Sequence, residues 1–391
     1  MRICYLINGL NGGGAAFPMT DVIRIMRSRG HEVDVVALMR QDGRAGKHLE
    51  NAGIPYRIIG SGPFDYLRSA IRLMRDLRHN TPDLIWTSLT RATVFGQVLG
   101  SRLNIPVVSW QHSAFLKPGN RAILRRTHPL THRWVADSAA VKSFLQRQVG
   151  IAASQIEVWP LFAASPSKPQ ANTQLTSAKF RIGSLGRLHP DKCYEQVLYL
   201  AAKLRDQDTQ LSRSIEFVIA GEGPERDRLE ALTRELDLTN VHFPGFTDRT
   251  AEFLAGLNAY IQPSRKEGLC IAAHEAMQAG LPVVASAVGE IANSVVNGET
   301  GWLCEVGDLD GLARAIRTLA NDRTRAAALG RAGRMRVLER FPAAALDTAG
   351  HSIIERLETE FSVDQNATIA HRRSPFVPVE SAQRVGQVSR K

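Results

Sequence analysis

Two glutamates stand eight positions apart in the segment from Ser264 to Glu290. Glu267 precedes a predicted helix and Glu275 lies two turns inside it, so both side chains can face one ligand across the helix N-terminus. The first turn of a helix also offers free N–H groups and the positive end of the helix dipole, which favour a phosphate. The segment therefore predicts a pocket for a molecule with hydroxyls at both ends and anionic oxygens between them, which is the layout of a nucleotide sugar.

Two basic residues follow another predicted strand in the same half of the chain. Arg187 and Lys192 come after the apolar segment Phe180 to Gly186, before the next predicted helix. A diphosphate suits such a pair, because a guanidinium donates to two oxygens at once and an ammonium acts as a point charge. Single glutamates or cations are usually solvated surface residues. These groups share the carboxyl edge of one predicted sheet, however, and this favours a pyrophosphate-sugar site.

A glycine-rich loop and a histidine are the candidates in the first half of the chain. Gly13 and Gly14 end a run of glycines between the predicted strand Arg2 to Ile7 and a helix, where backbone can pass close to a ligand. The spacing is not G-x-G-x-x-G, and turn geometry alone also explains such glycines. His112 follows the predicted strand Pro106 to Trp110, at a strand end where ligands bind. A structural histidine is an equally good interpretation.

Strands alternate with helical segments along most of the chain. This alternation predicts an α/β protein with parallel sheets that are covered on both faces. A segment rich in Pro, Ser, Asn and Thr after Leu161 predicts a linker between two doubly wound, Rossmann-like domains. We expect a first domain over residues 1–163, a linker over 164–178, a second domain over 179–342, a helical segment over 343–361 and a disordered basic tail over 362–391.

The composition is that of a globular protein. At 391 residues, of which 44% are hydrophobic, the chain is long enough for two domains. It has no run of about 18 apolar residues, and its N-terminus predicts a strand rather than a signal peptide. The four cysteines are scattered without CxxC pairing, which predicts a reducing cytoplasm with neither disulfides nor a zinc site.

The net charge of +11 resides mainly in the first 160 residues, which carry 21 basic and 10 acidic side chains. In the predicted helix Leu67 to His79, arginines and apolar residues lie on different faces, and a second basic cluster runs from Arg121 to Arg133. Such segments suit contact with anionic phospholipid headgroups. Alternatively, the apolar faces belong to the core of the domain and the arginines are solvated.

The order of these motifs resembles that of the retaining nucleotide-sugar glycosyltransferases of family 4, which have the GT-B fold of two Rossmann-like domains. The motifs are the glycine-rich first loop, the mid-domain histidine, GRLHPDK, GEGP, FPGF, SRKEGLCIAAHEAMQAGLPVVAS and NGETGWL. The resemblance covers roughly residues 1 to 350 and is densest in the second domain.

The resemblance implies a role for each candidate residue. His112 and Glu267 would make the catalytic contacts with the transferred sugar, and Glu275 would bind the ribose of the donor. The segment 343–361 would cross back to brace the first domain. The fold usually needs no metal or other cofactor, because cations and a helix dipole offset the charge of the leaving diphosphate. The donor diphosphate would be bound by Gly13, Gly14, Arg187, Lys192, Gly268, Leu269 and Cys270.

Four positions depart from the family pattern. Ala15 to Phe17 follow the glycine loop, where an acidic and a basic residue are usual. Pro160 to Phe162 replace a Pro-Asn-Gly turn, and Cys193 and Cys270 stand where the family commonly has glycine. These departures keep the donor site but bear on which sugar and acceptor the protein uses.

These features predict a retaining hexosyl- or N-acetylhexosaminyl-transferase that uses a nucleoside-diphosphate sugar and a saccharide or lipid-linked acceptor, in lipopolysaccharide or surface polysaccharide biosynthesis. A cytoplasmic location with peripheral contact to an anionic membrane is expected. One alternative is a nucleotide-sugar epimerase of the same fold, which needs acid and base carboxylates beyond Glu267 and Glu275. The other is a basic nucleic-acid-binding protein, but only 6% of the residues are aromatic and no nucleic-acid-binding motif is present, so nucleic acid is not an expected partner.

Overall fold

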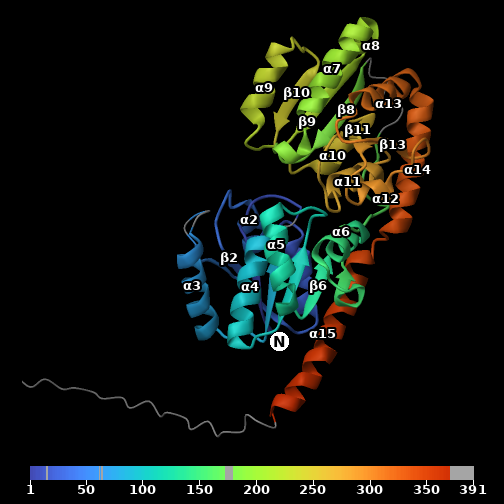
Figure 1. Cartoon of the computed structure of the whole chain (residues 1–391). Helices are drawn as coiled ribbons and strands as arrows, with labels where there is room; N and C mark the ends of the chain where they lie inside the picture. The colour runs from blue at the N-terminus through green and yellow to red at the C-terminus, as the bar shows by residue number, and fades with distance from the viewer. Residues whose placement is uncertain (15, 61, 63–64, 172–178, 370–391) are drawn as a thin grey trace, which may run out of the picture. The chain divides into compact units, whose positions relative to one another are not determined.

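The computed structural model describes residues 1–14, 16–60, 62, 65–171 and 179–369. The chain forms two compact units, Met1–His351 and Ser352–Lys391. The first unit contains two parallel sheets (Figure 1). Residues 172–178 of the expected linker and 370–391 of the expected tail lie outside the described residues.

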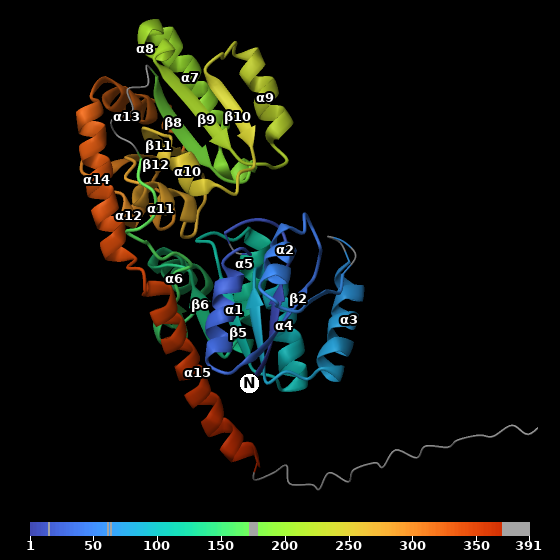
Figure 2. The ribbon, with the colours of Figure 1, turned by 180° about the vertical axis from the view of Figure 1, so that it is seen from behind.

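The first sheet has seven parallel strands in the order β3-β2-β1-β4-β5-β6-β7. Figure 1 shows α4 and α5 over one face of this sheet, and Figure 2, seen from behind, shows α1 over the other. Every residue of β4 and β5 is buried, as expected for strands that are covered on both faces. The strands are β1 (Arg2–Ile7), β2 (Glu32–Ala37), β3 (Tyr56–Ile58), β4 (Leu84–Ser88), β5 (Val107–Gln111), β6 (Arg133–Ala136) and β7 (Ile156–Val158). The helices are α1 (Met19–Ser28), α2 (Arg44–Asn51), α3 (Tyr66–His79), α4 (Thr90–Leu103), α5 (Pro118–Thr127) and α6 (Ala139–Phe144).

The second sheet has six parallel strands in the order β10-β9-β8-β11-β12-β13. Its core is built largely from apolar side chains of α7, α13 and the central strands. The strands are β8 (Phe180–Leu185), β9 (Ile215–Ala220), β10 (Val241–Gly245), β11 (Ala259–Gln262), β12 (Val283–Ser286) and β13 (Gly301–Cys304). The helices are α7 (Glu195–Gln207), α8 (Thr209–Arg213), α9 (Arg226–Glu235), α10 (Thr250–Ala255), α11 (Ile271–Gln278), α12 (Ile291–Ser294), α13 (Leu309–Asn321) and α14 (Arg323–Arg340).

The two parallel, doubly wound sheets confirm the predicted fold class. Within each sheet the strands are parallel, so their carboxyl ends share one edge, where the loops with candidate residues begin. The structure adds a strand that the sequence did not predict, β13, which pairs with β12 from Val283↔Gly301 to Ser286↔Cys304.

The last described helix, α15 (Ala345–Ile369), begins in the first unit. Its first turn contacts α1 and the segment after β7, because the Trp159 indole N–H donates to the Leu346 carbonyl at 2.9 Å and Arg24 pairs with Asp347 at 2.8 Å. The helix includes residues 362–369, which were expected in the disordered tail. Of the helices in the described ranges, none is both long enough and apolar enough to cross a bilayer.

Candidate active site

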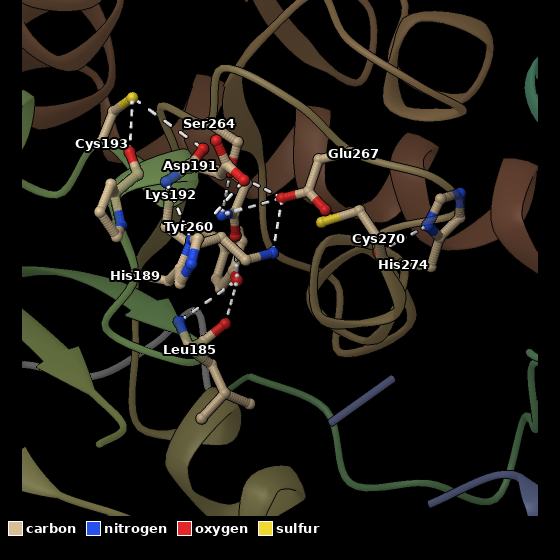
Figure 3. Close-up of polar contacts among 12 residues, drawn as sticks. Leu185, His189, Asp191, Lys192, Cys193, Tyr260, Ser264, Glu267, Cys270 and His274 are labelled. Atoms are coloured by element: carbon tan, nitrogen blue, oxygen red, sulfur yellow. Dashed lines mark hydrogen bonds and ion pairs between the residues drawn. The ribbon is translucent and has the colours of Figure 1, made fainter. Parts of the chain in front are cut away.

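Glu267 and Lys192 form an ion pair at the carboxyl ends of β11 and β8 (Figure 3). The Lys192 Nζ atom lies 2.7 Å from Glu267 Oε1, and the same oxygen accepts a 2.6 Å hydrogen bond from Ser264 Oγ. The Glu267 side chain is only 7% exposed. Burial acts to lower the pKa of Lys192, but the charge and hydrogen bond of Glu267, together with Cys270 and Tyr194, raise this pKa above its ordinary value, so the ammonium stays charged.

The start of α11 lies directly after this pair. Cys270 precedes the helix with a left-handed backbone, at φ 60°. In the described part of the chain, no group accepts a hydrogen bond from the amide N–H of Leu269, Cys270 or Ile271. These amides and the helix dipole offer an anion three donors next to the Lys192 ammonium. The Leu269 side chain is buried, so only its backbone can contact a ligand.

The glycine loop after β1 approaches the same helix end. A Cβ atom on Gly14 would lie 3.7 Å from Ile271 Cδ1, and one on Gly13 would meet no atom within 4 Å. Packing in the described structure therefore does not require a glycine at position 13. The missing side chain leaves open space in a loop that reaches the start of α11, as expected where backbone approaches a ligand.

Gly268 has a packing role that the sequence did not predict. A Cβ atom on Gly268 would collide with the carbonyl oxygen of His112. Next to this contact, the Ala114 N–H donates to the Glu267 carbonyl at 3.2 Å. The glycine is needed for the close approach of these two loops, whatever its amide contributes to a diphosphate.

The side chains of Glu275 and Arg187 have no hydrogen-bond partner among the described residues. Because α11 begins at Ile271, Glu275 lies about one turn inside the helix, and the prediction of two turns was wrong. Burial raises the pKa of Glu275 to about 7, and Lys168 offsets this only in part. Arg187 is exposed in the loop after β8. Both side chains are free to bind a ligand.

The His112 ring is held between two protein partners. Its Nε2 atom lies 2.6 Å from Ser88 Oγ and its Nδ1 atom 2.9 Å from Asp137 Oδ1. The ring stacks on Trp110, whose indole N–H donates to the same carboxylate oxygen at 2.6 Å. The Asp137 carboxylate fixes a proton on Nδ1. Contact between Nε2 and a sugar hydroxyl, as the resemblance implies, would therefore require Ser88 to give up its bond.

The hydrogen bonds from Ser88 to His112 and from His112 to Asp137 have the same arrangement as those of a Ser-His-Asp hydrolytic triad. Ser88 is fully buried, however, so an ester or amide has no path to its hydroxyl. The arrangement instead fixes the orientation of the imidazole at the end of β5.

Replacing Ser88 by Ala is expected to lower the free energy of unfolding by about 1–3 kcal/mol, because it leaves a buried imidazole nitrogen without its partner. Urea denaturation would measure the change. Ser113→Ala is the matched control, since no hydrogen bond of its hydroxyl is present in the described structure. Equal stability of the two variants would contradict the assigned role of Ser88.

Sequence reasoning missed four residues that shape these loops. Ser88, Asp137 and Ser264 each stand at or just after the carboxyl end of a strand, so the rule that identified His112 also identifies them. Glu290 carried no such signal. It is buried, and its carboxylate accepts from Arg340 at 2.7 Å and from the Ala140 N–H at 3.0 Å.

No group of three or more His, Cys, Asp or Glu side chains in the described ranges is arranged to hold a metal ion. The groups that the structure brings together are the Lys192 ammonium, the Glu267 carboxylate and the free amides of a helix start, with Glu275 one turn further along α11. Such a set can bind a diphosphate and the hydroxyls on either side of it.

Comparison with known proteins gives two family matches. Residues 168–336 match the family described as Glycosyl transferases group 1, and residues 12–162 match Glycosyltransferase Family 4. The chain is 27% identical to the sulfoquinovosyl transferase of Arabidopsis thaliana, over 80% of this chain and 64% of that protein. It is 28% identical to the 2-deoxystreptamine glucosyltransferase of Streptomyces kanamyceticus, over 71% of this chain and 78% of that protein.

A similar solved structure is that of Anabaena HepE in complex with UDP and glucose, with a TM-score of 0.76 and 23% sequence identity over 92% of this chain and 99% of HepE. At this identity the likeness concerns the fold. The Glycosyltransferase Family 4 match includes β2 to β7 of the first sheet, and the Glycosyl transferases group 1 match includes the whole second sheet. The curated relatives named above are glycosyltransferases. The chain therefore has the GT-B fold, and the family matches support a glycosyltransferase.

Proposed function

We propose that this glycosyltransferase takes its sugar from a nucleoside-diphosphate sugar and transfers it with retention at the anomeric carbon. The observation that carries the proposal is the Lys192–Glu267 pair beside the free amides at the start of α11, with Glu275 one turn further on. UDP and glucose bound to HepE support a donor of this class.

Each group has a place in the proposed reaction. Lys192, Arg187 and the α11 amides hold the diphosphate and offset the charge that it gains as it leaves. Glu275 accepts hydrogen bonds from the ribose hydroxyls, and Glu267 accepts from a hydroxyl of the transferred sugar. Glu267 is better suited to position the sugar than to attack it, and the acceptor then enters on the face that the diphosphate leaves. We expect no requirement for a divalent metal, since the cations and helix dipole perform that role.

Thermal-shift measurements with UDP-, GDP-, ADP- and TDP-sugars would test donor binding, because a bound donor raises the melting temperature by mass action. NMR of the product formed from the best donor would then report the anomeric configuration. Failure of all four classes to shift the melting temperature would overturn the donor assignment. A product with inverted configuration would overturn only the stereochemistry.

We also propose that the acceptor is lipid-linked and that α3 contacts an anionic membrane, as in lipopolysaccharide or surface polysaccharide biosynthesis. Leu73 and Leu77 of α3 are buried in the core, but Leu67 is 74% exposed and Ile71 44% exposed. Exposed apolar side chains among cations suit the boundary between lipid headgroups and acyl chains. The exposed arginines beside them are Arg68, Arg72 and Arg75.

The double variant Leu67→Gln, Ile71→Gln is expected to lose most of its binding to vesicles that contain anionic lipid, because it removes the apolar part of this surface. Flotation with anionic and with neutral vesicles would measure the change. Met335→Gln is the matched control, since Met335 is 73% exposed on α14. Equal flotation of both variants with anionic vesicles would count against membrane contact through α3. Binding of the unmodified protein to neutral vesicles as tightly as to anionic ones would also count against it.

A further inference from the structure

A pocket of about 720 Å³ lies beside the loop that carries Glu267. The Ala114 N–H, in its wall, donates to the Glu267 carbonyl at 3.2 Å. A Cβ atom on Gly289, also in its wall, would lie 2.8 Å from the same carbonyl. The volume falls in the range of small-molecule sites. Its lining residues are contributed by the loop after β5, by α5, by α6 with the turn that follows it, and by residues 289–293.

The charged side chains of the lining are both cationic. Arg121 and Arg147 line the pocket, and no carboxylate does. Arg121 Nη1 donates to Gln148 Oε1 at 3.1 Å, which orients the guanidinium without neutralising it. Within the described residues, Arg147 has no hydrogen-bond or ion-pair partner. The pocket therefore holds two positive charges that have no protein counterion in its lining.

A buried acid that contacts the lining, Glu290, does not remove this charge. Glu290 contacts two residues of the lining, since it accepts from the Ala140 N–H at 3.0 Å and from Asn293 Nδ2 at 3.3 Å. Its other oxygen is paired with Arg340 at 2.7 Å, and the side chain is buried. The Glu290–Arg340 pair is neutral as a whole, so the arginines of the lining keep their excess charge.

The rest of the lining suits a saccharide. Phe144 and the face of Phe115 opposite Lys266, whose ammonium lies 3.6 Å from the Phe115 ring centroid, offer ring surface. Ser143, Gln148 and Asn293 offer hydroxyl and amide groups for hydrogen bonds. Apolar walls with a few convergent polar groups are typical of sites for polar small molecules. Two guanidinium groups in the same wall add donors that match the oxygens of a phosphate or carboxylate.

We propose that this pocket binds the acceptor and that the acceptor is a saccharide with a phosphate or carboxylate group. The inference rests on the proposed function, because the pocket is assigned to the acceptor by its contact with the Glu267 loop. Arg121 and Arg147 hold the anionic group, and the aromatic wall contacts the sugar ring.

The full chain would be titrated calorimetrically with glucose 6-phosphate, glucuronate, glucose and inorganic phosphate, each with and without saturating UDP. We expect the two anionic sugars to bind about tenfold more tightly than glucose, since each adds charge-assisted hydrogen bonds. Inorganic phosphate is expected to bind more weakly than glucose 6-phosphate. Arg121→Gln and Arg147→Gln are each expected to weaken the binding of anionic sugars about tenfold.

Arg126→Gln is the matched control, because Arg126 is exposed on the same helix and does not line the pocket. Equal affinity for glucose and glucose 6-phosphate would overturn the inference. So would an equal loss of affinity for the anionic sugars in Arg126→Gln and Arg121→Gln. Phosphate that binds as tightly as glucose 6-phosphate would show a free-anion site and would also overturn it. UDP binding is read separately, so its absence would count against the proposed donor and not against this pocket. Melting curves would confirm that each variant is folded.

Discussion

Replacing Glu267 by Gln is expected to lower the rate of sugar transfer about 100-fold or more and to tighten the binding of nucleoside diphosphates. Glu267 is the counterion of Lys192 in the free protein, with 2.7 Å between Nζ and Oε1. A diphosphate that recruits Lys192 must therefore compete with a carboxylate already in contact with it. The variant removes that competitor.

The same substitution removes the negative charge that would stabilise an oxocarbenium-like transition state next to the sugar. Gln can still accept the hydrogen bond from Ser264, which lies 2.6 Å from Oε1 in the native protein. Since the side chain keeps its size and one hydrogen bond, the variant is expected to fold. The variant should therefore have a lower kcat, but it should not bind the donor more weakly than the native protein.

Steady-state kinetics would report transfer, and calorimetry with UDP or the best nucleoside diphosphate would report affinity. Ser264→Ala is the matched control, since it removes one hydrogen bond to Glu267 and leaves the ion pair. Lys192→Met should weaken diphosphate binding strongly. Undiminished transfer by Glu267→Gln would refute the catalytic assignment. Weaker diphosphate binding by this variant would refute the competition between carboxylate and diphosphate for Lys192.

The fold and the meeting of Lys192 with Glu267 could be predicted because both depend on local patterns. Apolar runs of strand length, separated by helical segments, define two parallel sheets. Parallel strands end at one edge, so polar residues after β8 and β11 must lie near each other. Lys192 and Glu267, which are 75 positions apart in sequence, meet for this reason.

The remaining details depend on tertiary packing that no local pattern encodes. Gly268 is required by the approach of the His112 carbonyl, a contact between distant parts of the chain. The His112 ring is fixed by Ser88 and Asp137, which come from two neighbouring strand ends. The left-handed backbone of Cys270 sets where α11 begins, and this placed Glu275 one turn nearer to the helix start than predicted.

Replacing Glu275 by Gln is expected to stabilise the free protein above pH 7 and to weaken nucleotide binding. Burial raises the pKa of Glu275 from an ordinary value of 4.5 to about 7. Between these two values the folded protein keeps a proton that the unfolded chain has lost, so native stability falls as the pH rises from 4.5 to 7. Well above pH 7 the carboxyl is ionised in both states, so native stability falls no further. Gln does not titrate, so the variant should be more stable there by about 3 kcal/mol.

Denaturation of both proteins at pH 4.5 and pH 8 would measure this difference, which should be absent at the lower pH. Glu299→Gln is the matched control, because Glu299 is an exposed glutamate. A gain in stability of equal size in the control, or at both pH values, would contradict the assignment of the effect to the half-buried Glu275 carboxyl.

Nucleotide binding provides an independent measurement of the same carboxyl group. Ribose hydroxyls that donate to Glu275 favour its ionised form and lower its pKa, so binding should release a proton between pH 6 and 7. Calorimetry in buffers of different ionisation enthalpy would count the protons released, and nucleotide affinity should rise from pH 6 to pH 8. Glu275→Gln should show no proton release and about tenfold weaker binding at pH 8, because a neutral amide accepts weaker hydrogen bonds than a carboxylate. Proton release that persists in this variant would place the titrating group elsewhere and remove Glu275 from the ribose site.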